Sequence, residues 1–254
     1  MKSQIIYTVL FVGSMLTAKA QTKPEETEIW APIPKEVVTG KPYSDPPSDA
    51  IVLFDGKNLD QWVSAQNRDQ QAAWTIQDNT LLVKKGTGNI ETKRLFNNYQ
   101  LHIEWQIPAS ITGEGQGRGN SGVFLASLGK GDAGYELQVL DSYNNKTYVN
   151  GMAGSMYKQL IPLANPAKKP GEWQTYDVVW MAPVFNDDGS VKSPARVTIL
   201  FNGVLVENNM ELTGPTLYIG KPVYKKHGPS PIKLQAHGDK SEPLSFRNIW
   251  VREL

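Results

Sequence analysis

The residues best suited to chemistry lie in one short stretch, residues 134–141, which reads Gly-Tyr-Glu-Leu-Gln-Val-Leu-Asp. Apolar residues alternate there with Glu136 and Gln138, which is the period-two pattern of a half-buried strand. A carboxyl group and an amide therefore share one face of a predicted sheet. Asp141 joins that face only if a β-bulge interrupts the strand. The alternative is an ordinary solvated sheet face that ends in an Asp turn.

Two other segments, residues 101–107 and 232–237, also alternate and predict strands with a polar row. Their polar positions are His102, Glu104, Gln106, Lys233, Gln235 and His237. If all three strands share one sheet, the rows form a patch that holds Glu104, Glu136, Gln138, Gln235 and His237. Such a mixture of titratable and hydrogen-bonding groups suits the hydroxyls of a sugar.

His237 is the strongest candidate for a general base. It ends its predicted strand at a turn, projects on the same face as Gln235 and has a side chain that titrates near neutral pH. His227 lies in a basic loop, where a bracing or solvated role is the ordinary one. His102 shares its predicted face with Glu104, either as a metal ligand or as a surface residue.

Composition predicts one soluble domain. The chain has 254 residues, of which 40% are hydrophobic and 20% charged, and a formal net charge of +1. A single all-β domain of ~200 to 250 residues is common. No block of like charge indicates a nucleic acid or an anionic membrane as partner. The sequence has no cysteine, which excludes disulfides, thiolate chemistry and lipid attachment to an N-terminal Cys.

Two segments precede the predicted domain. Residues 1–20 have the pattern of a secretory signal peptide, with a lysine, a short apolar run and small residues that predict cleavage after Ala20. The run is too short to span a membrane. Residues 21–48 are rich in proline and predict a linker or a strap along the domain surface. The domain then covers residues 49–254, and an export signal without cysteine predicts a periplasmic or secreted bacterial protein.

From residue 51 onward the sequence predicts short β segments separated by Gly, Asn or Pro, with no convincing helical period. This spacing is typical of a sandwich or barrel. Asn202 and Gly203, between two apolar runs, predict a type I′ hairpin. Residues 117–122 match the letters of a dinucleotide fingerprint, but a strand follows them where a helix is required. We therefore expect no nucleotide or redox cofactor.

A succession of short motifs resembles the family of 3-keto-disaccharide hydrolase domains over about residues 50–254. The motifs are LFDGKNL at 53–59, EW at 104–105, GNSGVF at 119–124, GYELQVLD at 134–141, GEWQTY at 171–176, FNG at 201–203, LQAHG at 234–238 and FRNI at 246–249. The resemblance implies an all-β, concanavalin-like jelly-roll sandwich of two antiparallel sheets. It also implies an exported bacterial enzyme that acts on glycosides already oxidised at C3 by a partner oxidoreductase.

The reaction that this resemblance implies needs three chemical roles. A ketone at C3 acidifies the C2 proton, so a base can remove it, the C1 substituent departs, and water adds back. This route needs a base, a stabiliser for the enolate and a proton donor to the leaving oxygen. We assign the base to His237 and the acid to Glu136 or Glu104. The enolate role falls to Arg118, Asn120, Gln138 or a bound divalent cation, which would polarise the ketone, while Asp141 and Gln235 complete the expected substrate contacts.

Two other functions fit the same residues. A conventional retaining β-glycosidase would use Glu136 with Asp141, a spacing similar to the Glu-x-Asp-x-x-Glu strand of concanavalin-like glucanases. Here, however, the middle residue is an amide and the last acid is one methylene shorter, which disturbs the ~5 to 5.5 Å carboxyl separation of retaining enzymes. A non-catalytic carbohydrate-binding module would use the same polar face only to bind. Turnover of keto-sugars, of ordinary sugars or of neither separates the three functions.

Overall fold

The computed structural model describes residues 23–42 and 44–254. The predicted signal peptide, residues 1–20, lies outside the described residues. The chain divides into two units between Glu36 and Val37. Within the described ranges the helical elements are the short 3₁₀ turns η1 (Pro24–Thr27), η2 (Gly115–Gly117) and η3 (Val149–Gly151), and none of the described helices has the length and hydropathy to cross a membrane.

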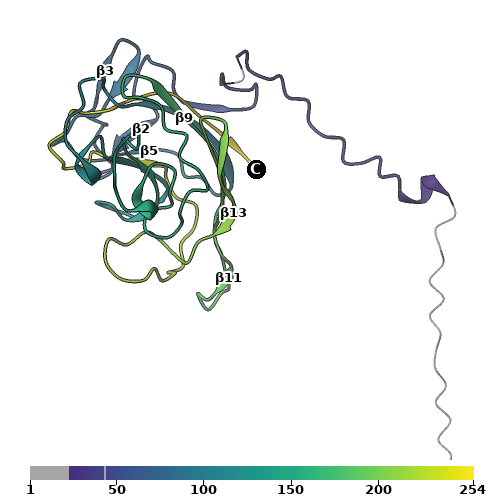
Figure 1. Ribbon diagram of the computed structural model, residues 1–254. Helices are drawn as coiled ribbons and strands as arrows, with labels where there is room; N and C mark the ends of the chain where they lie inside the picture. The colour runs from purple at the N-terminus through teal and green to yellow at the C-terminus, as the bar shows by residue number, and fades with distance from the viewer. Residues whose placement is uncertain (1–22, 43) are drawn as a thin grey trace, which may run out of the picture. The chain divides into compact units, whose positions relative to one another are not determined.

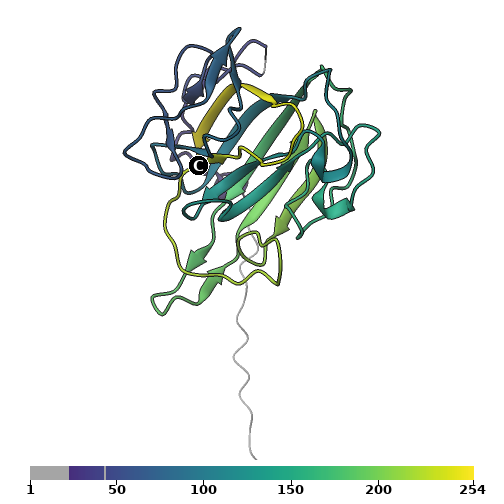
Figure 2. The same cartoon turned by 90° about the vertical axis from the view of Figure 1, so that its left-hand side faces the viewer.

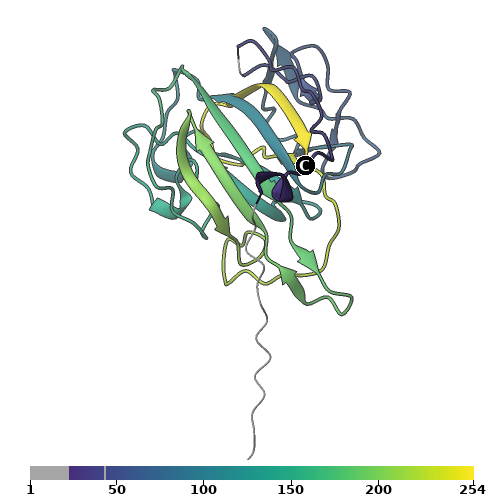
Figure 3. The ribbon, with the colours of Figure 1, turned by 90° about the vertical axis from the view of Figure 1, so that its right-hand side faces the viewer.

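The larger sheet is antiparallel and has eight strands. Its order is β13 (Val204–Glu211), β12 (Arg196–Phe201), β9 (Trp173–Met181), β6 (Tyr99–Gln106), β15 (Ser245–Glu253), β4 (Thr80–Leu82) and β3 (Thr75–Gln77), with β1 (Ile51–Phe54) also paired to β15. Thus β6 borders β15 on one side, while β4 and β1 pair with its first and second halves on the other. Figure 3 shows this sheet, with β15 in yellow.

The smaller sheet has five strands in the order β2 (Trp62–Ser64), β5 (Ile90–Thr92), β14 (Lys233–Leu234), β7 (Ser121–Ser127) and β8 (Gly134–Val139). A separate hairpin joins β10 (Val184–Phe185) to β11 (Val191–Ser193). Figure 1 shows the two sheets as two layers, with β2 and β5 in one and β9 and β13 in the other. Figure 2 shows the layers from the side of the smaller sheet.

The core lies between the layers, because alternate residues of each strand point inward. On β6 the apolar residues Leu101, Ile103 and Trp105 are buried in this core. Trp105 lies 5.4 Å from Tyr176 and 5.7 Å from Phe201 between ring centroids, so aromatic packing joins three neighbouring strands. The predicted fold class, a sandwich of two antiparallel sheets, is confirmed.

The hairpin between β12 and β13 forms where the sequence predicts it. Asn202 and Gly203 have φ angles of 50° and 78°, both positive, as a type I′ turn requires. The strands that flank the turn pair directly, with Phe201 opposite Val204. The local turn chemistry therefore sets this register.

The segment before β1 lies against β15. The Ser44 carbonyl accepts hydrogen bonds from Asn248 Nδ2 and from Trp250 Nε1, both at 2.8 Å. Arg252 Nε lies 2.8 Å from Asp49 Oδ2. Through these contacts residues 44–49 cover part of the outer face of the larger sheet, and we call residues 37–42 and 44–49 the strap.

Candidate active site

A cavity of about 480 Å³ opens on the face of the five-stranded sheet that points away from the core. This volume lies within the usual range of small-molecule sites. Five of the residues that the sequence indicates line it together, namely Asn120, Glu136, Gln138, Gln235 and His237. Six further residues complete the lining, namely Gln116, Asp132, Tyr148, Tyr157, Thr216 and Tyr218.

Strand register places the polar side chains next to one another. Gly122 on β7 pairs with Gln138 on β8, and the backbone N–H of Gln235 donates to the Gly122 carbonyl at 3.0 Å. A Cβ atom on Gly122 would lie only 2.5 Å from Glu136 Oε1. The missing side chain therefore makes room for the Glu136 carboxyl group above the centre of the sheet.

The Glu136 side chain is buried in the cavity wall and makes no hydrogen bond within the described part of the chain; the residue is 6% exposed. Burial, together with the negative charge of Asp132, raises the pKa of Glu136 to about 8, and the positive charge of Lys233 opposes this shift. At neutral pH this carboxyl group holds its proton. It can therefore donate a proton to a bound molecule.

Lys233 holds the loop that carries Asp132. Its ammonium is buried beneath residues 129–133 and donates to the carbonyls of Gly129, Gly131 and Ala133 at 2.7, 2.9 and 3.1 Å. Burial lowers the pKa of Lys233 to about 8, and the nearby carboxylates oppose this shift. The three carbonyl acceptors fix the loop, and with it the charge that acts on Glu136.

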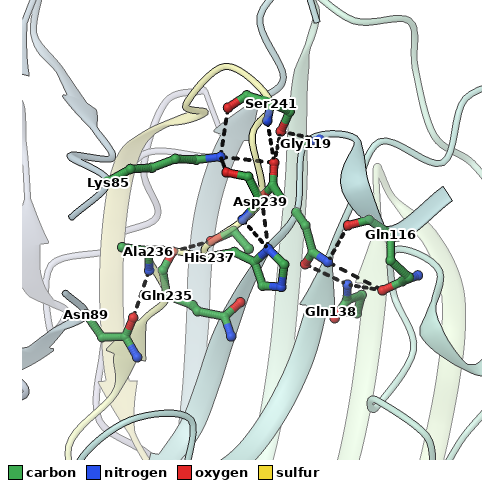
Figure 4. Close-up of polar contacts among 12 residues, drawn as sticks. Lys85, Asn89, Gln116, Gly119, Gln138, Gln235, Ala236, His237, Asp239 and Ser241 are labelled. Atoms are coloured by element: carbon green, nitrogen blue, oxygen red, sulfur yellow. Dashed lines mark hydrogen bonds and ion pairs between the residues drawn. The ribbon is translucent and has the colours of Figure 1, made fainter. Parts of the chain in front are cut away.

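His237 is oriented by the residues that follow it. Its Nδ1 lies 2.9 Å from Asp239 Oδ2, and Asp239 in turn contacts Lys85 Nζ at 3.0 Å and the Ser241 hydroxyl. Burial raises the pKa of Asp239, but hydrogen bonds from Ser241, His237 and Lys85 outweigh it and lower the pKa below its ordinary value. When Nδ1–H donates to this carboxylate, Nε2 keeps its lone pair for the cavity; in the other tautomer Nδ1 accepts from the Asp239 backbone N–H, 3.2 Å away (Figure 4).

The amide groups of the cavity fall into two sets. Gln138 Nε2 donates to Asn120 Oδ1 at 3.1 Å and to Gln116 Oε1 at 3.4 Å, and Asn120 Nδ2 donates to the backbone carbonyl of Gln116 at 2.8 Å, so these three residues hold one another. Gln235 differs, because its Oε1 is buried without a partner in the described structure. Figure 4 shows Gln235 beside His237, on the opposite side from Gln116 and Gln138. A buried amide oxygen without a partner in the protein can accept a hydrogen bond from a ligand.

A family model described as a 3-keto-alpha-glucoside-1,2-lyase-like domain matches residues 49–252. The chain belongs to this family. The resemblance seen in the sequence is thereby confirmed. A comparison with curated proteins found no match.

Solved structures agree with this family assignment. The chain is similar to a candidate glycosyl hydrolase of Parabacteroides distasonis, with 50% sequence identity and a TM-score of 0.86 over 94% of this chain and 100% of that chain. Two more candidate glycosyl hydrolases from that organism share the fold, with 19% and 22% identity and TM-scores of 0.59 and 0.54. Each match covers 81% of this chain, and 94% and 99% of the respective other chain.

Within this lyase-like domain, Glu104 lies elsewhere than the sequence predicts. The expectation that all three polar rows share one sheet is wrong, because β6 belongs to the eight-stranded sheet. Glu104 Oε2 accepts from Arg247 Nε at 2.6 Å and its Oε1 from Asn248 at 2.9 Å. Burial raises the pKa of Glu104, but hydrogen bonds from His102, Asn248 and Arg247 outweigh it and lower the pKa to about 2. Glu104 is thus an ionised bracing residue outside the cavity.

Arg118 and Asp141 also lie outside the cavity lining, contrary to the sequence prediction. Asp141 was predicted to join the face of Glu136 only through a β-bulge, and the pairing of β7 with β8 is regular from Glu136 to Val139. Asp141 is buried and pairs with Arg118, with 2.8 Å between Nε and Oδ2. Arg118 also donates to the Tyr143 carbonyl at 2.6 Å. This ion pair fixes the loop after β8.

The predicted divalent cation has few ligands at this site. The cavity offers the carboxyl groups of Glu136 and Asp132 and the imidazole of His237, but no group of three or more acidic, histidine or cysteine side chains in residues 23–42 and 44–254 is arranged to bind a metal. Glu136, protonated at neutral pH, is a poor metal ligand. These residues do not fit a metal site, and the chemistry below uses the side chains alone.

Sequence reasoning missed the loop residues of the cavity. Asp132 lies between glycines in a turn, and Tyr148, Tyr157 and Tyr218 come from three irregular segments. A strand's period-two pattern says nothing about such positions. Asp239 could have been found from the sequence, because it lies only two residues after His237 and such a spacing favours contact between the two side chains.

Proposed function

We propose that this protein cleaves 3-keto-glycosides by removing the C2 proton, eliminating the C1 substituent and then adding water. Family membership and the similar candidate glycosyl hydrolase support a carbohydrate-active hydrolase. The observation that carries the proposal is the presence in one cavity of an imidazole oriented by Asp239 and a carboxyl group that stays protonated at neutral pH. Base and acid are the pair that this elimination needs.

His237 takes the C2 proton. The hydrogen bond from Nδ1 to Asp239 leaves Nε2 as the basic atom, and it stabilises the imidazolium that forms when the proton arrives. Lys85 and Ser241 hold Asp239 in place, and Asp239 in turn fixes the orientation of the His237 imidazole. Even beside a ketone the C2 proton is a weak acid, so a base that is already oriented contributes strongly to the rate of its removal.

Glu136 protonates the departing oxygen. Its proton is present below about pH 8 because burial disfavours the carboxylate. Loss of that proton to the leaving group creates a buried charge, and Lys233, whose positive charge lowers the pKa of Glu136, stabilises it. Water then adds to C1 and gives a proton to the Glu136 carboxylate, while the His237 imidazolium returns its proton to C2, so both groups regain their starting state.

Gln235 stabilises the enolate oxygen at C3. Its side chain lines the cavity and makes no hydrogen bond within the described residues, so its N–H groups are available to the substrate. The Gln138 amide holds its neighbours instead, since its Nε2 donates to Asn120 Oδ1 at 3.1 Å and to Gln116 Oε1 at 3.4 Å. Donors already fixed at the place where negative charge develops lower the barrier without rearrangement.

The geometry is less favourable to a conventional retaining glycosidase. Asp141, the second carboxylate of that hypothesis, is turned to Arg118 outside the cavity lining. Asp132 does line the cavity, and its side chain accepts from Asn89 Nδ2 at 3.0 Å. Turnover of an unoxidised glycoside would assign the nucleophile to Asp132 and overturn the keto-sugar proposal.

The proposal also covers where the protein acts and which class of enzyme produces its substrate. The signal-peptide pattern of residues 1–20 supports export to the periplasm or the medium. A 3-keto-glycoside must come from an oxidoreductase that removes hydrogen from the C3 hydroxyl. The keto-sugar chemistry therefore implies a functional partner of that class.

The test is release of the aglycone from a 3-keto-glucoside and from its unoxidised parent, with and without EDTA. We expect turnover of the keto compound alone, unaffected by EDTA. His237→Ala should lower kcat by ~10²- to 10⁴-fold. His227→Gln is the matched control, since His227 contacts Tyr135 and Gly228 outside this cavity. Wild-type activity in the His237 variant, or no turnover of either compound, contradicts the proposal.

A further inference from the structure

Three tyrosines form a wall at one end of the cavity. Tyr148 and Tyr157 line it with their hydroxyl oxygens 2.6 Å apart, and Tyr218 lines it from the segment after β13. The Lys158 ammonium lies 4.1 Å from the ring centroid of Tyr218, and 5.7 and 5.6 Å from those of Tyr148 and Tyr157. Cation–π contacts of this kind hold rings in place. The tyrosine wall is therefore a prearranged surface.

Apart from the exposed Tyr218 hydroxyl, for which the described residues supply no partner, the polar groups of the tyrosine wall already have partners. The two tyrosine hydroxyls bond each other, and Lys158 Nζ donates to the Tyr218 carbonyl at 2.7 Å. Gln159, next in the chain, donates to the Gly214 carbonyl and accepts from Thr213. The wall thus presents ring surface to a ligand. Sugar hydroxyls need hydrogen-bond partners when they are buried, whereas a flat apolar group needs only ring contact.

The residues on either side of Tyr218 are apolar and exposed. Leu217, Tyr218 and Ile219 have 40%, 71% and 82% of their surface exposed. Lys158 covers one face of the Tyr218 ring, and so large an exposed fraction leaves the other face open. Consecutive exposed apolar side chains beside a cavity mark a binding surface.

The tyrosine wall adjoins the proposed acid. The backbone N–H of Tyr157 donates to the Glu136 carbonyl at 3.0 Å, and the hydroxyl of Thr216, two residues before Tyr218, accepts from the Glu136 N–H at 3.0 Å. The base and the free amide, His237 and Gln235, come instead from β14 and the residues after it. A group protonated by Glu136 thus departs beside the aromatic rings.

We propose that the tyrosine wall is the subsite for the leaving group and that it selects glycosides of aromatic alcohols over disaccharides. This inference rests on the proposed function, because it places the keto-sugar ring at the polar end, between His237 and Glu136. The aglycone ring then stacks on the open face of Tyr218. A substrate with one polyhydroxyl end and one flat aromatic end matches the two ends of the cavity.

The first experiment compares a benzyl 3-keto-glucoside with a 3-keto-disaccharide of glucose. Both leaving groups are alcohols, so differences in KM report binding more than leaving ability. We expect a KM at least about 10-fold lower for the benzyl compound. Tyr218→Ala should raise the benzyl KM by about 10-fold and change that of the disaccharide by less than about 2-fold. Val223→Ala, at an exposed position in the same segment, is the control.

An equal or larger loss on the disaccharide in Tyr218→Ala would make the wall a sugar subsite and overturn the inference. A second measurement separates this failure from a failure of the proposed function. Calorimetry of unoxidised benzyl and ethyl glucosides needs no turnover. Tighter binding of the benzyl compound that disappears in Tyr218→Ala supports the aromatic subsite even if no 3-keto-glycoside reacts. Equal binding of the two compounds by the wild-type protein contradicts it whatever the reaction.

Discussion

At the scale of single residues, Glu136 is where catalysis and folding stability oppose each other. Burial raises its pKa from the ordinary 4.5 to about 8. Between these two pH values the folded protein holds a proton that the unfolded chain releases. The contribution of Glu136 to stability is thus fully present below pH 4.5 and is lost as pH rises towards 8.

Replacing this residue should therefore stabilise the protein while it removes activity. Glu136→Gln keeps the size of the side chain and cannot ionise, so we expect a gain in the free energy of unfolding at pH 8 on the order of 3 kcal/mol relative to wild type. The gain should be near zero at pH 4.5. Urea unfolding of both proteins at the two pH values measures it, and an equal difference at both would contradict a buried protonated carboxyl group.

Asp132 should set the alkaline limit of activity. Because the acid must be protonated, kcat/KM for a 3-keto-glucoside should fall above about pH 8. The charge of Asp132 contributes to the raised pKa of Glu136, so Asp132→Asn should move that alkaline limb to lower pH. Profiles of kcat/KM against pH for both proteins provide the measurement. A limb that stays in place would show that Asp132 does not act on the acid.

The residues of the site differ in whether the neighbouring sequence is enough to predict their position. Glu136 and Gln138 follow from the period of β8, and Gln235 and His237 from the alternation of residues 232–237, of which only Lys233 and Leu234 form a strand; the structure brings all four into one cavity. Their roles stay predictions. Asp132 and the three tyrosines were not predictable, since loops bring them in and loop positions depend on contacts distant in sequence. Asp141 could reach the site only through a bulge, and the register of β8 from Glu136 to Val139 contains none; its partner Arg118 lies outside the cavity lining with it.

At the scale of elements, close packing of β7 against β8 sets the position of the acid. Gly122→Ala would place a Cβ atom 2.5 Å from Glu136 Oε1. The carboxyl group can swing away more easily than the backbone can move, so we expect a stable protein with at least about 10-fold lower kcat. Gly228→Ala is the matched control, because a Cβ there meets no atom within 4 Å. Thermal unfolding and kinetics of the two variants are compared.

Should Gly122→Ala keep full activity, the carboxyl group tolerates displacement and its assigned position is wrong.

The elements themselves were largely predictable: the alternation of β6 and β8 and the Asn202–Gly203 turn all appear as the sequence indicates. The pairing of β6 was not, because period two fixes which residues share a face and leaves open which sheet the strand joins. Glu104 was misassigned for this reason.

At the scale of the whole molecule, the strap adds stability from outside the sandwich. A chain that starts at Val37 keeps the Ser44 carbonyl, whereas one that starts at Asp49 leaves Asn248 Nδ2 and Trp250 Nε1 without that acceptor. We expect the first truncation to unfold like a chain that starts at Gln21, and the second to lose about 2 kcal/mol. Urea unfolding of the three chains tests this. Equal stability of all three would mean that water replaces Ser44 without cost.

The position of β15 also governs when the protein can fold. The strand β15 pairs with β1, β4 and β6, so until it has been synthesised those three strands have an open edge. Pairings between the beginning and the end of a chain form slowly, on a scale of milliseconds to seconds for such sandwiches. A chain stopped at residue 244 would display unpaired strand edges and aggregate rather than fold. The larger sheet can therefore be completed only after residue 253 has been synthesised, and a chaperone that covers the open strand edges before then would protect the nascent chain from aggregation.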